Sequence, residues 1–432
     1  MDNSTIANVS QAAKSIGVSV DTIRRWEKKG LIKGSRSSLN YRLFNIDELK
    51  RLHKKINGKS AKSNYKILVS DKKTKYTSIE LFAGCGGTAL GLENAGFEHV
   101  LLNEFDKNAV ATLKKNRPNW NIIEGDVRKL DFDGLEADVV QGGFPCQAFS
   151  YAGKKMGFED ARGTLFFEFA RCIKAVKPKI AVAENVRGLL THEDGRTLAS
   201  MVEILEELGY KVSYKILKAQ YFDVPQKRER LIILAVRNDL DMPFIFPQEK
   251  DYTVSLKEAL KDCPPSIGQK YPEKKHEILK LIPPGGYWRD LPEKLQREYM
   301  GASYFQGGGK TGMARRLSWD EPSLTLTCSP AQKQTERCHP EETRPLNVNE
   351  YARIQTFPDN WEFVGSTASQ YKQIGNAVPV NLAYHIGKCL IEMLDGEFLG
   401  KNLVKNPRSR IKQNGRHIYE EKKELDNVRT FS

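Results

Sequence analysis

Short apolar segments alternate with helical segments along the middle of the chain, beginning at Tyr76. The apolar segments have the length of strands and read TSIELF, HVLLNEF, NIIEGD, ADVVQGG, IAVAENV and RLIILAV, and helical segments such as GTALGLENAG and RTLASMVEILEELG separate them. This alternation predicts an α/β fold in which a doubly wound, mostly parallel sheet is covered by helices on both faces. Ligands of such sheets bind at the carboxyl ends of the strands, where we expect the functional residues.

The first 58 residues have a different pattern, made of short helices. We predict one helix from Ser10 to Ile16, a turn of two residues, and a second helix that runs through TIRRWEKKG and stops at Gly30. A small hairpin around residues 41–44 and a helix through IDELKRLHKKI complete the module.

The order of these elements, with the motif IGVSVDTIRRWEKKGLI, resembles the DNA-binding module of the MerR-type regulators. The resemblance implies a helix-turn-helix whose second helix contacts DNA through Arg24 and Arg25. The alternative for this module is a small helical cap that binds another protein.

Charge is concentrated at the N-terminus. Residues 1–75 hold 18 Lys/Arg against 6 Asp/Glu, whereas the other 357 residues hold 50 against 48. A nucleic-acid surface in the main body must therefore come from local clustering of basic residues.

The remaining composition predicts a soluble protein of the cytoplasm. The seven cysteines form no CxxC pair, and Cys338 beside His339 lacks a second pair, so we expect reduced thiols and no metal site. No apolar run approaches the roughly 20 residues of a membrane span, and the N-terminus lacks the apolar stretch of a signal peptide.

A glycine-rich loop follows the first strand, in LFAGCGGTALGLENAG. Gly84, Gly86 and Gly87 permit a tight turn and a close approach of a ligand to the backbone at the start of a helix. Glu104 ends the second strand, where an acid can accept ribose hydroxyls, and Asp126 ends the third, where it suits an adenine amino group. These residues alone would also fit a nucleotide-binding oxidoreductase, which would leave the later motifs without a purpose.

Six motifs in fixed order carry a more specific resemblance. They are FAGCGG at 82–87, FPCQ at 144–147, ENV at 184–186, QKRER at 226–230, RPLNVNEYARIQTFPDNW at 344–361 and QIGNAVP at 373–379. Over about residues 76–395 the chain resembles the cytosine carbon-5 DNA methyltransferases of restriction-modification systems. The resemblance implies the fold of S-adenosylmethionine-dependent methyltransferases, with S-adenosylmethionine as the cofactor.

The resemblance also implies the catalytic residues. Carbon 5 of cytosine is a poor nucleophile, so the thiolate of Cys146 first adds to carbon 6. Glu184 would hold N3 and the exocyclic amine, Arg228 would stabilise charge near the base, and Arg230 would orient or pair with neighbouring groups. A structural ion pair is the alternative for Glu184 and Arg228. The base that removes the carbon-5 proton is not identified.

The cofactor site implied by the resemblance draws on the ends of several strands. Its residues are Phe82, Gly84, Gly86, Gly87, Glu104, Asp126, Val127, Pro145 and Asn376.

Double-stranded DNA is the expected substrate, and the target cytosine must leave the stacked duplex to be reached. By resemblance, Gln147, Ser150 and the loop through GKKMGFEDARG close over the base, although that loop would also suit a solvated surface. The segment between Arg237 and Arg344 is rich in Pro, Gly, Tyr and Trp, and by resemblance it is the expected target-recognition domain. The candidate DNA contacts beyond the loop are Gln226, Arg315, Arg316, Thr325 and Thr327.

These assignments divide the chain into successive parts. They are the helix-turn-helix module 1–58, a Lys/Ser-rich linker 59–75, the catalytic domain 76–238, the smaller irregular target-recognition domain 239–343, the return of the chain to the catalytic domain 344–396, and a basic tail 397–432. The tail would bind phosphates or simply be solvated.

Two other functions stay open at this point. One is a tRNA cytosine-5 methyltransferase, and the other is a transcriptional repressor that binds its own promoter through the N-terminal module. For a restriction-modification enzyme we expect a monomer and a cognate restriction endonuclease that acts on the same site without a stable complex.

Overall fold

The core of the protein is a seven-stranded sheet with the order β6-β5-β4-β7-β8-β11-β9. The computed structural model describes residues 6–16, 18, 20–28, 30–37, 41–57, 65–145, 164–307, 310–396, 409–413 and 416–420. The strands from β6 to β8 are parallel, and β11 is antiparallel to both β8 and β9. The predicted mostly parallel α/β sheet is thereby confirmed. The strands are β4 (Thr77–Leu81), β5 (Glu98–Glu104), β6 (Ile122–Glu124), β7 (Val139–Gly142), β8 (Ile180–Val186), β9 (Tyr210–Lys218) and β11 (Glu229–Arg237).

Strand β9 is the element of the sheet that the sequence analysis missed. Its sequence, YKVSYKILK, alternates apolar residues with lysines and has no long apolar run. In the described part of the chain, β9 pairs with β11 alone and lies at the edge of the sheet, where alternate side chains face solvent. This position explains why β9 lacks the apolar run by which the other strands were predicted.

Helices cover both faces of the sheet because alternate residues of a strand point to opposite sides. Ala181 and Ala183 of β8 belong to one apolar cluster with residues of α6 and α7, whereas Ile180 and Val182 belong to another with residues of α4 and α13. The covering helices are α4 (Gly87–Ala95), α6 (Leu165–Val176), α7 (Arg196–Glu207) and α13 (Val380–Asp395), and α5 (Lys107–Asn116) connects β5 to β6.

Helices α4 and α13 pack closely through two glycines. A Cβ added to Gly91 would lie 2.4 Å from the Cβ of Ala383, and one added to Gly387 would lie 2.7 Å from the Cβ of Ala95. No ordinary side chain fits at either position, so this contact fixes α13, the last long helix, against the helix that follows the glycine-rich loop.

The segment before β4 is bound to the main body rather than free. The Tyr65 hydroxyl donates to the carbonyl oxygen of Arg353 at 3.1 Å, and the backbone N–H of Leu68 donates to Asn381 Oδ1 at 2.9 Å. Residues 65–75, which the composition assigned to a linker, therefore belong to the packed body. Lysines and serines are common in linkers, but here the backbone and a tyrosine make the contacts.

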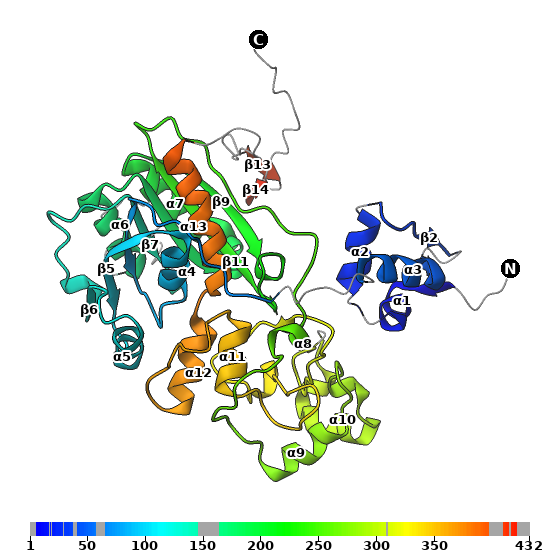
Figure 1. Ribbon diagram of the computed structural model, residues 1–432. Coiled ribbons are helices and arrows are strands. Elements are labelled where there is room, and N and C mark those ends of the chain that lie inside the picture. Colours follow the sequence, from blue (N-terminus) through cyan, green and yellow to red (C-terminus); the bar gives the residue numbers. More distant parts are fainter. Residues whose placement is uncertain are drawn as a thin grey trace.

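The N-terminal module is a small helical unit with its own apolar core. It contains β1 (Ile6–Asn8), α1 (Val9–Ser15), α2 (Val20–Lys28), β2 (Ser35–Arg36), β3 (Arg42–Asn45) and α3 (Ile46–Asn57). Buried Ile23 and Trp26 of α2 pack with Phe44 and Leu49. Asn8 begins α1 with a capping box. The two helices, the hairpin and the third helix occur as predicted, and Figure 1 shows the module beside the body with α2 nearest to it.

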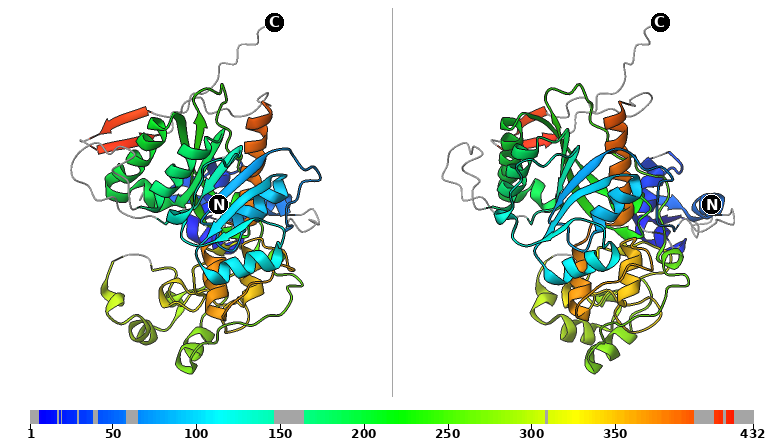
Figure 2. Two further views of the ribbon diagram at one scale, coloured as in Figure 1. Left: turned by 90° about the vertical axis from the view of Figure 1, so that its left-hand side faces the viewer. Right: turned by 60° about the vertical axis from the view of Figure 1, so that its left-hand side comes forward.

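Most of two further stretches lies below the sheet in Figures 1 and 2, whereas α13, at the end of the second stretch, covers a face of the sheet. We call residues 239–343 the insert and residues 344–396 the return segment. The insert contains α8 (Leu256–Ala259), α9 (Glu273–Lys280), α10 (Glu293–Met300) and β12 (Ser323–Leu324), and the return segment contains α11 (Val348–Ile354), α12 (Thr367–Asn376) and α13. β12 pairs in parallel with β10 (Gln226–Lys227), which precedes β11.

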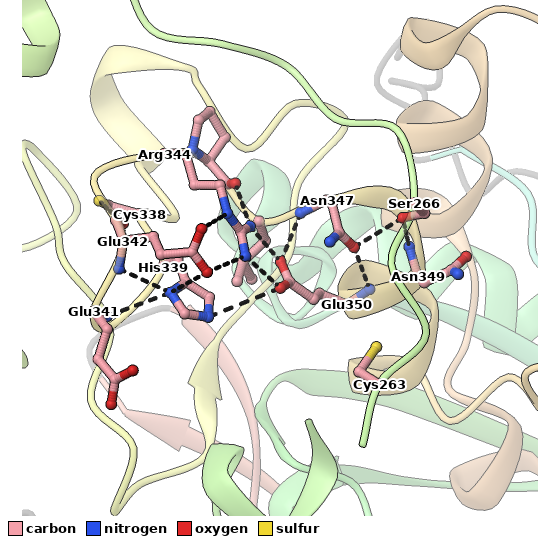
Figure 3. Close-up of polar contacts among 12 residues, drawn as sticks. Cys263, Ser266, Cys338, His339, Glu341, Glu342, Arg344, Asn347, Asn349 and Glu350 are labelled. Carbon is pink, nitrogen blue, oxygen red and sulfur yellow. Dashed lines mark hydrogen bonds and ion pairs between the residues drawn. The ribbon is translucent and has the colours of Figure 1, made fainter. Parts of the chain in front are cut away.

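A polar cluster joins the insert to α11 of the return segment (Figure 3). The guanidinium of Arg344 donates to both carboxylate oxygens of Glu350, at 2.9 and 2.8 Å. Asn347 caps α11 and accepts a hydrogen bond from Ser266 at 2.9 Å. His339 lies 3.8 Å from Glu350. Burial lowers the pKa of His339, so its neutral form is favoured in this cluster.

Little of the basic tail lies within the described residues. β13 (Ser409–Gln413) and β14 (Arg416–Glu420) pair as an antiparallel hairpin. Among the described residues, no helix is both long enough and apolar enough to cross a bilayer.

Candidate functional site

A cavity of about 1130 Å³ opens at the carboxyl ends of the parallel strands. It is lined by residues at or near the carboxyl ends of β4, β5, β6, β7 and β8, together with Arg230 of β11 and the end of α12. The predicted residues that line it are Phe82, Gly84, Gly87, Glu104, Asp126, Val127, Pro145, Glu184, Arg230 and Asn376.

The glycine-rich loop forms one wall of the cavity. Gly84 and Gly86 have φ angles of 56° and 91°, which a side chain would strain. A Cβ on Gly87 would lie 2.2 Å from the carbonyl oxygen of Val378, so α4 can begin here only with glycine. Phe82 also has a positive φ, of 60°, although it is not glycine. Such strain is typical of functional sites.

Glu104 is fixed at the end of β5 by three backbone N–H groups. Its carboxylate accepts from Gly84 at 2.7 Å, from Phe105 at 2.8 Å and from Asp106 at 2.7 Å. The carboxylate therefore links the glycine-rich loop to the next strand. Phe105, beside it, is 72% exposed and lines the cavity, and Asp106 forms an ion pair of 3.1 Å with Lys372 of α12.

Asp126 lies at the next strand end, after β6. Arg128 donates to both of its carboxylate oxygens, at 3.0 and 2.6 Å. These hydrogen bonds lower the pKa of Asp126 to about 2, so the carboxylate is ionised at every working pH. Val127, beside it, is buried and lines the cavity.

Phe144 and Pro145, the first two residues of the FPCQ motif, line the cavity after β7. Asn185 of the ENV motif donates through Nδ2 to the carbonyl oxygen of Phe144 at 3.0 Å and so ties the two motifs together. Pro145 is exposed at the cavity. Cys146, Gln147 and Ser150 lie outside the described residues.

Glu184 and Arg230 form the charged pair of the cavity. Arg230 Nε lies 2.5 Å from Glu184 Oε1, and their side chains are only 12% and 15% exposed. A Cβ on Gly143 would lie 3.4 Å from Glu184 Oε2, which places the carboxylate over the backbone that leads into the FPCQ motif. Glu184 is therefore held next to the segment that carries Cys146 along the chain.

Arg228 has a different environment from the one we predicted. It is 1% exposed and donates to the carbonyl oxygens of Leu326 at 3.2 Å and Gly375 at 3.1 Å. Burial lowers its pKa to about 9. The prediction that Arg228 contacts the base is therefore wrong, and so is the alternative that Arg228 forms an ion pair with Glu184. Arg230 takes the place beside Glu184, and Arg228 joins the insert to the return segment.

Gln226 and Arg316, two of the candidate DNA contacts, are buried. Gln226 is 0% exposed, donates to Gln355 Oε1 at 2.9 Å and accepts from the N–H of Leu326 at 3.0 Å. Arg316 is 3% exposed and donates to the carbonyl oxygens of Leu279, His339 and Glu341 and to the Thr343 hydroxyl. Both predictions are wrong, because each side chain is buried and makes its hydrogen bonds to groups inside the protein.

The other candidates in the insert are half-buried. Arg315 lies with its guanidinium 6.0 Å from the ring centroid of Tyr287, and burial lowers its pKa. Thr325 donates to the carbonyl oxygen of Lys227, and Thr327 donates to that of Ser329. These side chains can still face DNA, which stays a prediction.

The two arginines of the N-terminal module differ in their surroundings. Arg24 is exposed, as a phosphate-contacting residue should be. Arg25 lies with its guanidinium 4.8 Å from the ring centroid of Tyr221 in the main body, a cation–π distance.

Sequence reasoning missed several cavity residues. Phe105 and Lys372 are next to predicted site residues or motifs, and Asn185 lies inside the ENV motif. Their contacts with the cavity or with Phe144 depend on the fold. Glu80 and Gln141 had a sequence signal that was overlooked, because each is a polar residue inside a buried strand.

Comparisons with known proteins agree with this geometry. The model of the C-5 cytosine-specific DNA methylases matches residues 76–392, and the model of the MerR family regulatory proteins matches residues 8–44. The chain is 57% identical over 406 residues to the type II methyltransferase M.Eco47II of Escherichia coli, which covers 90% of this chain and 96% of that protein. It is 53% identical over 396 residues to the type II methyltransferase M.PspPI of Psychrobacter sp., over 89% and 95% of the two chains.

The solved structures add support for the fold alone. One structure, of a candidate DNA modification methyltransferase encoded within an E. coli prophage, aligns with a TM-score of 0.54 at 22% identity, over 74% of this chain and 100% of that chain. The family model covers well over half of the chain, and both relatives exceed half identity across nearly its whole length. The chain therefore belongs to the C-5 cytosine-specific DNA methylase family, whose activity is the methylation of cytosine carbon 5 in DNA.

Proposed function

We propose that the cavity binds S-adenosylmethionine beside a flipped-out cytosine and that Cys146, Glu184 and Arg230 act on the base. The observation that carries this proposal is the Glu184–Arg230 pair, which is mostly buried and held 2.5 Å apart over the backbone that leads to FPCQ. A carboxyl and a guanidinium at one end of a cofactor-sized cavity match the polar edge of a cytosine.

The residues present fit S-adenosylmethionine, the methyl donor that the family implies. The glycine-rich loop leaves room for a ligand against its backbone, Glu104 offers an anchored carboxylate for ribose hydroxyls, and Phe105 offers an exposed ring for the adenine. Asp126 offers an ionised acceptor for the adenine amine. When bound, the cofactor supplies an electrophilic methyl group.

The reaction on the base uses three residues of this chain and one further acceptor, which takes the carbon-5 proton. The Cys146 sulfur forms a bond to carbon 6, which raises the electron density at carbon 5 so that it can take the methyl group. Glu184 holds N3 and the exocyclic amine, and Arg230 holds Glu184 in place and supplies positive charge at the base. Loss of the carbon-5 proton to a base then lets the Cys146 sulfur leave.

The insert is the proposed target-recognition region. It lies beside the cavity because Arg228, Gln226 and the β10–β12 pairing join it to the strand that carries Arg230. Extrusion of the cytosine costs on the order of a few kcal/mol, which contacts from the insert to the remaining DNA would offset.

We also propose that the chain is the modification enzyme of a restriction-modification system. Its relatives at 57% and 53% identity are type II methyltransferases. The restriction endonuclease would act separately on the same site, and a monomer suffices, because one chain holds every residue proposed for the reaction.

Bisulfite sequencing of plasmid DNA from cells that express the chain tests the proposed reaction. We expect protected cytosines in one short sequence context with the intact chain and none with a Cys146→Ala variant of equal expression. Complete conversion in both samples, with folded protein, would contradict the proposal. A parallel assay on total tRNA distinguishes the RNA alternative.

A second proposed function is autoregulation by the N-terminal module. The observations that support it are the helix-turn-helix fold, the MerR match over residues 8–44 and the exposed Arg24 on α2. A gel-shift assay with the chain's own promoter tests it. We expect an Arg24→Ala, Arg25→Ala double variant to lose promoter binding and to keep methylation. Loss of methylation instead would mean that the module helps to hold substrate DNA.

A further inference from the structure

Two buried polar side chains lie side by side on the floor of the cavity. Glu80 of β4 and Gln141 of β7 are partners in the parallel strand register, and they are 1% and 3% exposed. Both residues line the cavity. Within the described part of the chain, neither Glu80 Oε2 nor Gln141 Oε1 has a hydrogen-bond partner. Two unpaired buried oxygens on neighbouring strands require an explanation, because each costs about 1–3 kcal/mol if left unsatisfied.

A single proton satisfies both atoms. Neighbouring strands lie about 4.8 Å apart, so the side chains of register partners are within reach of one another. A protonated Glu80 can donate from Oε2 to Gln141 Oε1, whereas an ionised Glu80 offers only acceptors. Burial, and then the nearby charge of Glu104, raises the pKa of Glu80 well above its ordinary value. Geometry and electrostatics therefore agree on a neutral Glu80 in the free protein.

Among the residues that the structure describes, no cation pairs with Glu80. Other carboxylates of the cavity are paired, Glu184 with Arg230, Asp106 with Lys372 and Asp126 with Arg128. On β5, Glu104 is held by backbone N–H groups, and His99, which burial keeps neutral by lowering its pKa, hydrogen-bonds to Ser78 of β4. Exposed Glu124 and Lys107 line the cavity rim. A cation that enters the cavity would thus find Glu80 uncompensated.

We propose that Glu80 senses the charge of the ligand: it is neutral and bonded to Gln141 in the free protein, and it releases its proton when the cationic S-adenosylmethionine binds. The inference rests on the proposed cofactor site. S-adenosylmethionine carries a positive sulfonium, whereas the product S-adenosylhomocysteine has an uncharged thioether and is otherwise ionised alike. In the balanced step the O–H bond of Glu80 breaks and the proton passes to the buffer.

The sign of the pH effect follows from linkage. A bound cation lowers the pKa of Glu80 from its raised value in the free protein, so between the two pKa values binding releases a proton. In that window the affinity for S-adenosylmethionine rises as the pH rises, by at most tenfold per pH unit, and above the raised pKa it becomes constant. The affinity for S-adenosylhomocysteine should change less steeply with pH, because this ligand lacks the sulfonium charge. The arrangement favours the substrate over the product.

Isothermal titration calorimetry in buffers of different ionisation enthalpy measures the protons released. With the full-length chain between pH 6 and 9, we expect S-adenosylmethionine to release close to one more proton than S-adenosylhomocysteine at the most favourable pH. Equal proton release for the two ligands would overturn the proposal. This comparison uses unaltered protein. Absence of any binding heat, with no binding of radiolabelled S-adenosylmethionine, would instead overturn the proposed cofactor site.

A Glu80→Gln variant and a matched control locate the proton. Glu80→Gln keeps the volume and should release no extra proton. Its preference for S-adenosylmethionine over S-adenosylhomocysteine should fall about 100-fold, because release of close to one proton requires a pKa shift of about two units. Glu124→Gln removes an exposed carboxyl from the same cavity and should behave as the unaltered chain does. Full proton release by a folded Glu80→Gln variant would contradict the assignment to Glu80.

Discussion

The cavity and the insert satisfy their charged side chains in different ways. In the cavity, Glu184 and Asp126 pair with arginines and keep an edge toward open space, where a ligand can compete for them. In the insert, Arg316 and Arg337 are buried and donate to backbone carbonyl oxygens. Burial lowers the pKa of Arg337 to about 10, yet the guanidinium remains charged at neutral pH.

The difference separates two uses of the same residue types. A charge that faces a cavity costs little to maintain and can act on a ligand, whereas a buried guanidinium stabilises the fold only while each of its donors has an acceptor. The insert has few long elements and a small apolar cluster of its own, and buried arginines join its loops in addition. Substitutions should therefore affect chemistry in the cavity and stability in the insert.

Glu184→Gln should have the largest effect on the reaction. The amide keeps the size of the side chain but cannot hold the base as a proton donor and acceptor in turn, so we expect kcat to fall by about 10³-fold. Single-turnover transfer of tritiated methyl groups to DNA measures it. Melting temperature and cofactor binding serve as controls, and a rate within tenfold of the unaltered chain would remove Glu184 from the catalytic set.

Arg230→Ala and Arg228→Ala form a matched pair on one stretch of chain. Arg230→Ala should lower kcat about 10²-fold with a small change in melting temperature, because its partner lies at the cavity. Arg228→Ala should lower the free energy of unfolding by about 3 kcal/mol or more, because it leaves buried carbonyl groups unpaired. Urea denaturation measures the free energy of unfolding of both variants, and steady-state kinetics measures kcat. A stable Arg228→Ala variant with low kcat, beside an unstable Arg230→Ala variant with normal kcat, would restore the original prediction for Arg228.

Arg316→Ala tests the insert in the same way. Loss of a guanidinium that donates to four acceptors should destabilise the protein by about 3 kcal/mol, while the sequence context of methylation in the folded fraction stays the same. Bisulfite sequencing at 20 °C gives the context. A stable variant that methylates additional sequences would show that Arg316 reads DNA after all.

Asp126→Asn should have the smallest effect. The affinity for S-adenosylmethionine should weaken by about fivefold, which is the effect of losing one hydrogen bond to a solvent-accessible group. Because the pKa of Asp126 is about 2, its charge is lost only as the pH falls toward that value. Asp126 should therefore add no pH dependence to binding between pH 5 and 9. Calorimetry on both proteins checks this, and a binding transition that disappears in the variant would contradict it.

Much of the cavity could be predicted because local sequence determines it. The turn after β4 needs glycines, and the acids at the ends of β5 and β6 follow from the strand pattern and the chain order. Glu184 and Arg230 meet because β8 and β11 are neighbours in the sheet, and the motifs did not predict this strand order.

The rest depended on contacts between distant residues. Arg228 and Arg230 are two positions apart, which would place them on one face of a regular strand, but Arg228 lies between β10 and β11, where the alternation is broken. The partners of Arg316 come from residues 279, 339, 341 and 343, and nothing in the local sequence indicates that they surround it. Charge alone does not distinguish a DNA contact from a buried structural arginine.

The most direct test of the catalytic assignment is to trap the covalent intermediate. DNA made with 5-fluorocytosine in place of cytosine cannot lose its carbon-5 substituent as a proton, so the bond to the enzyme should persist after methyl transfer. Incubation with S-adenosylmethionine, protease digestion and mass spectrometry should show a methylated fluorocytosine attached at Cys146. An adduct at another residue, or no adduct from a preparation that methylates ordinary DNA, would contradict the account.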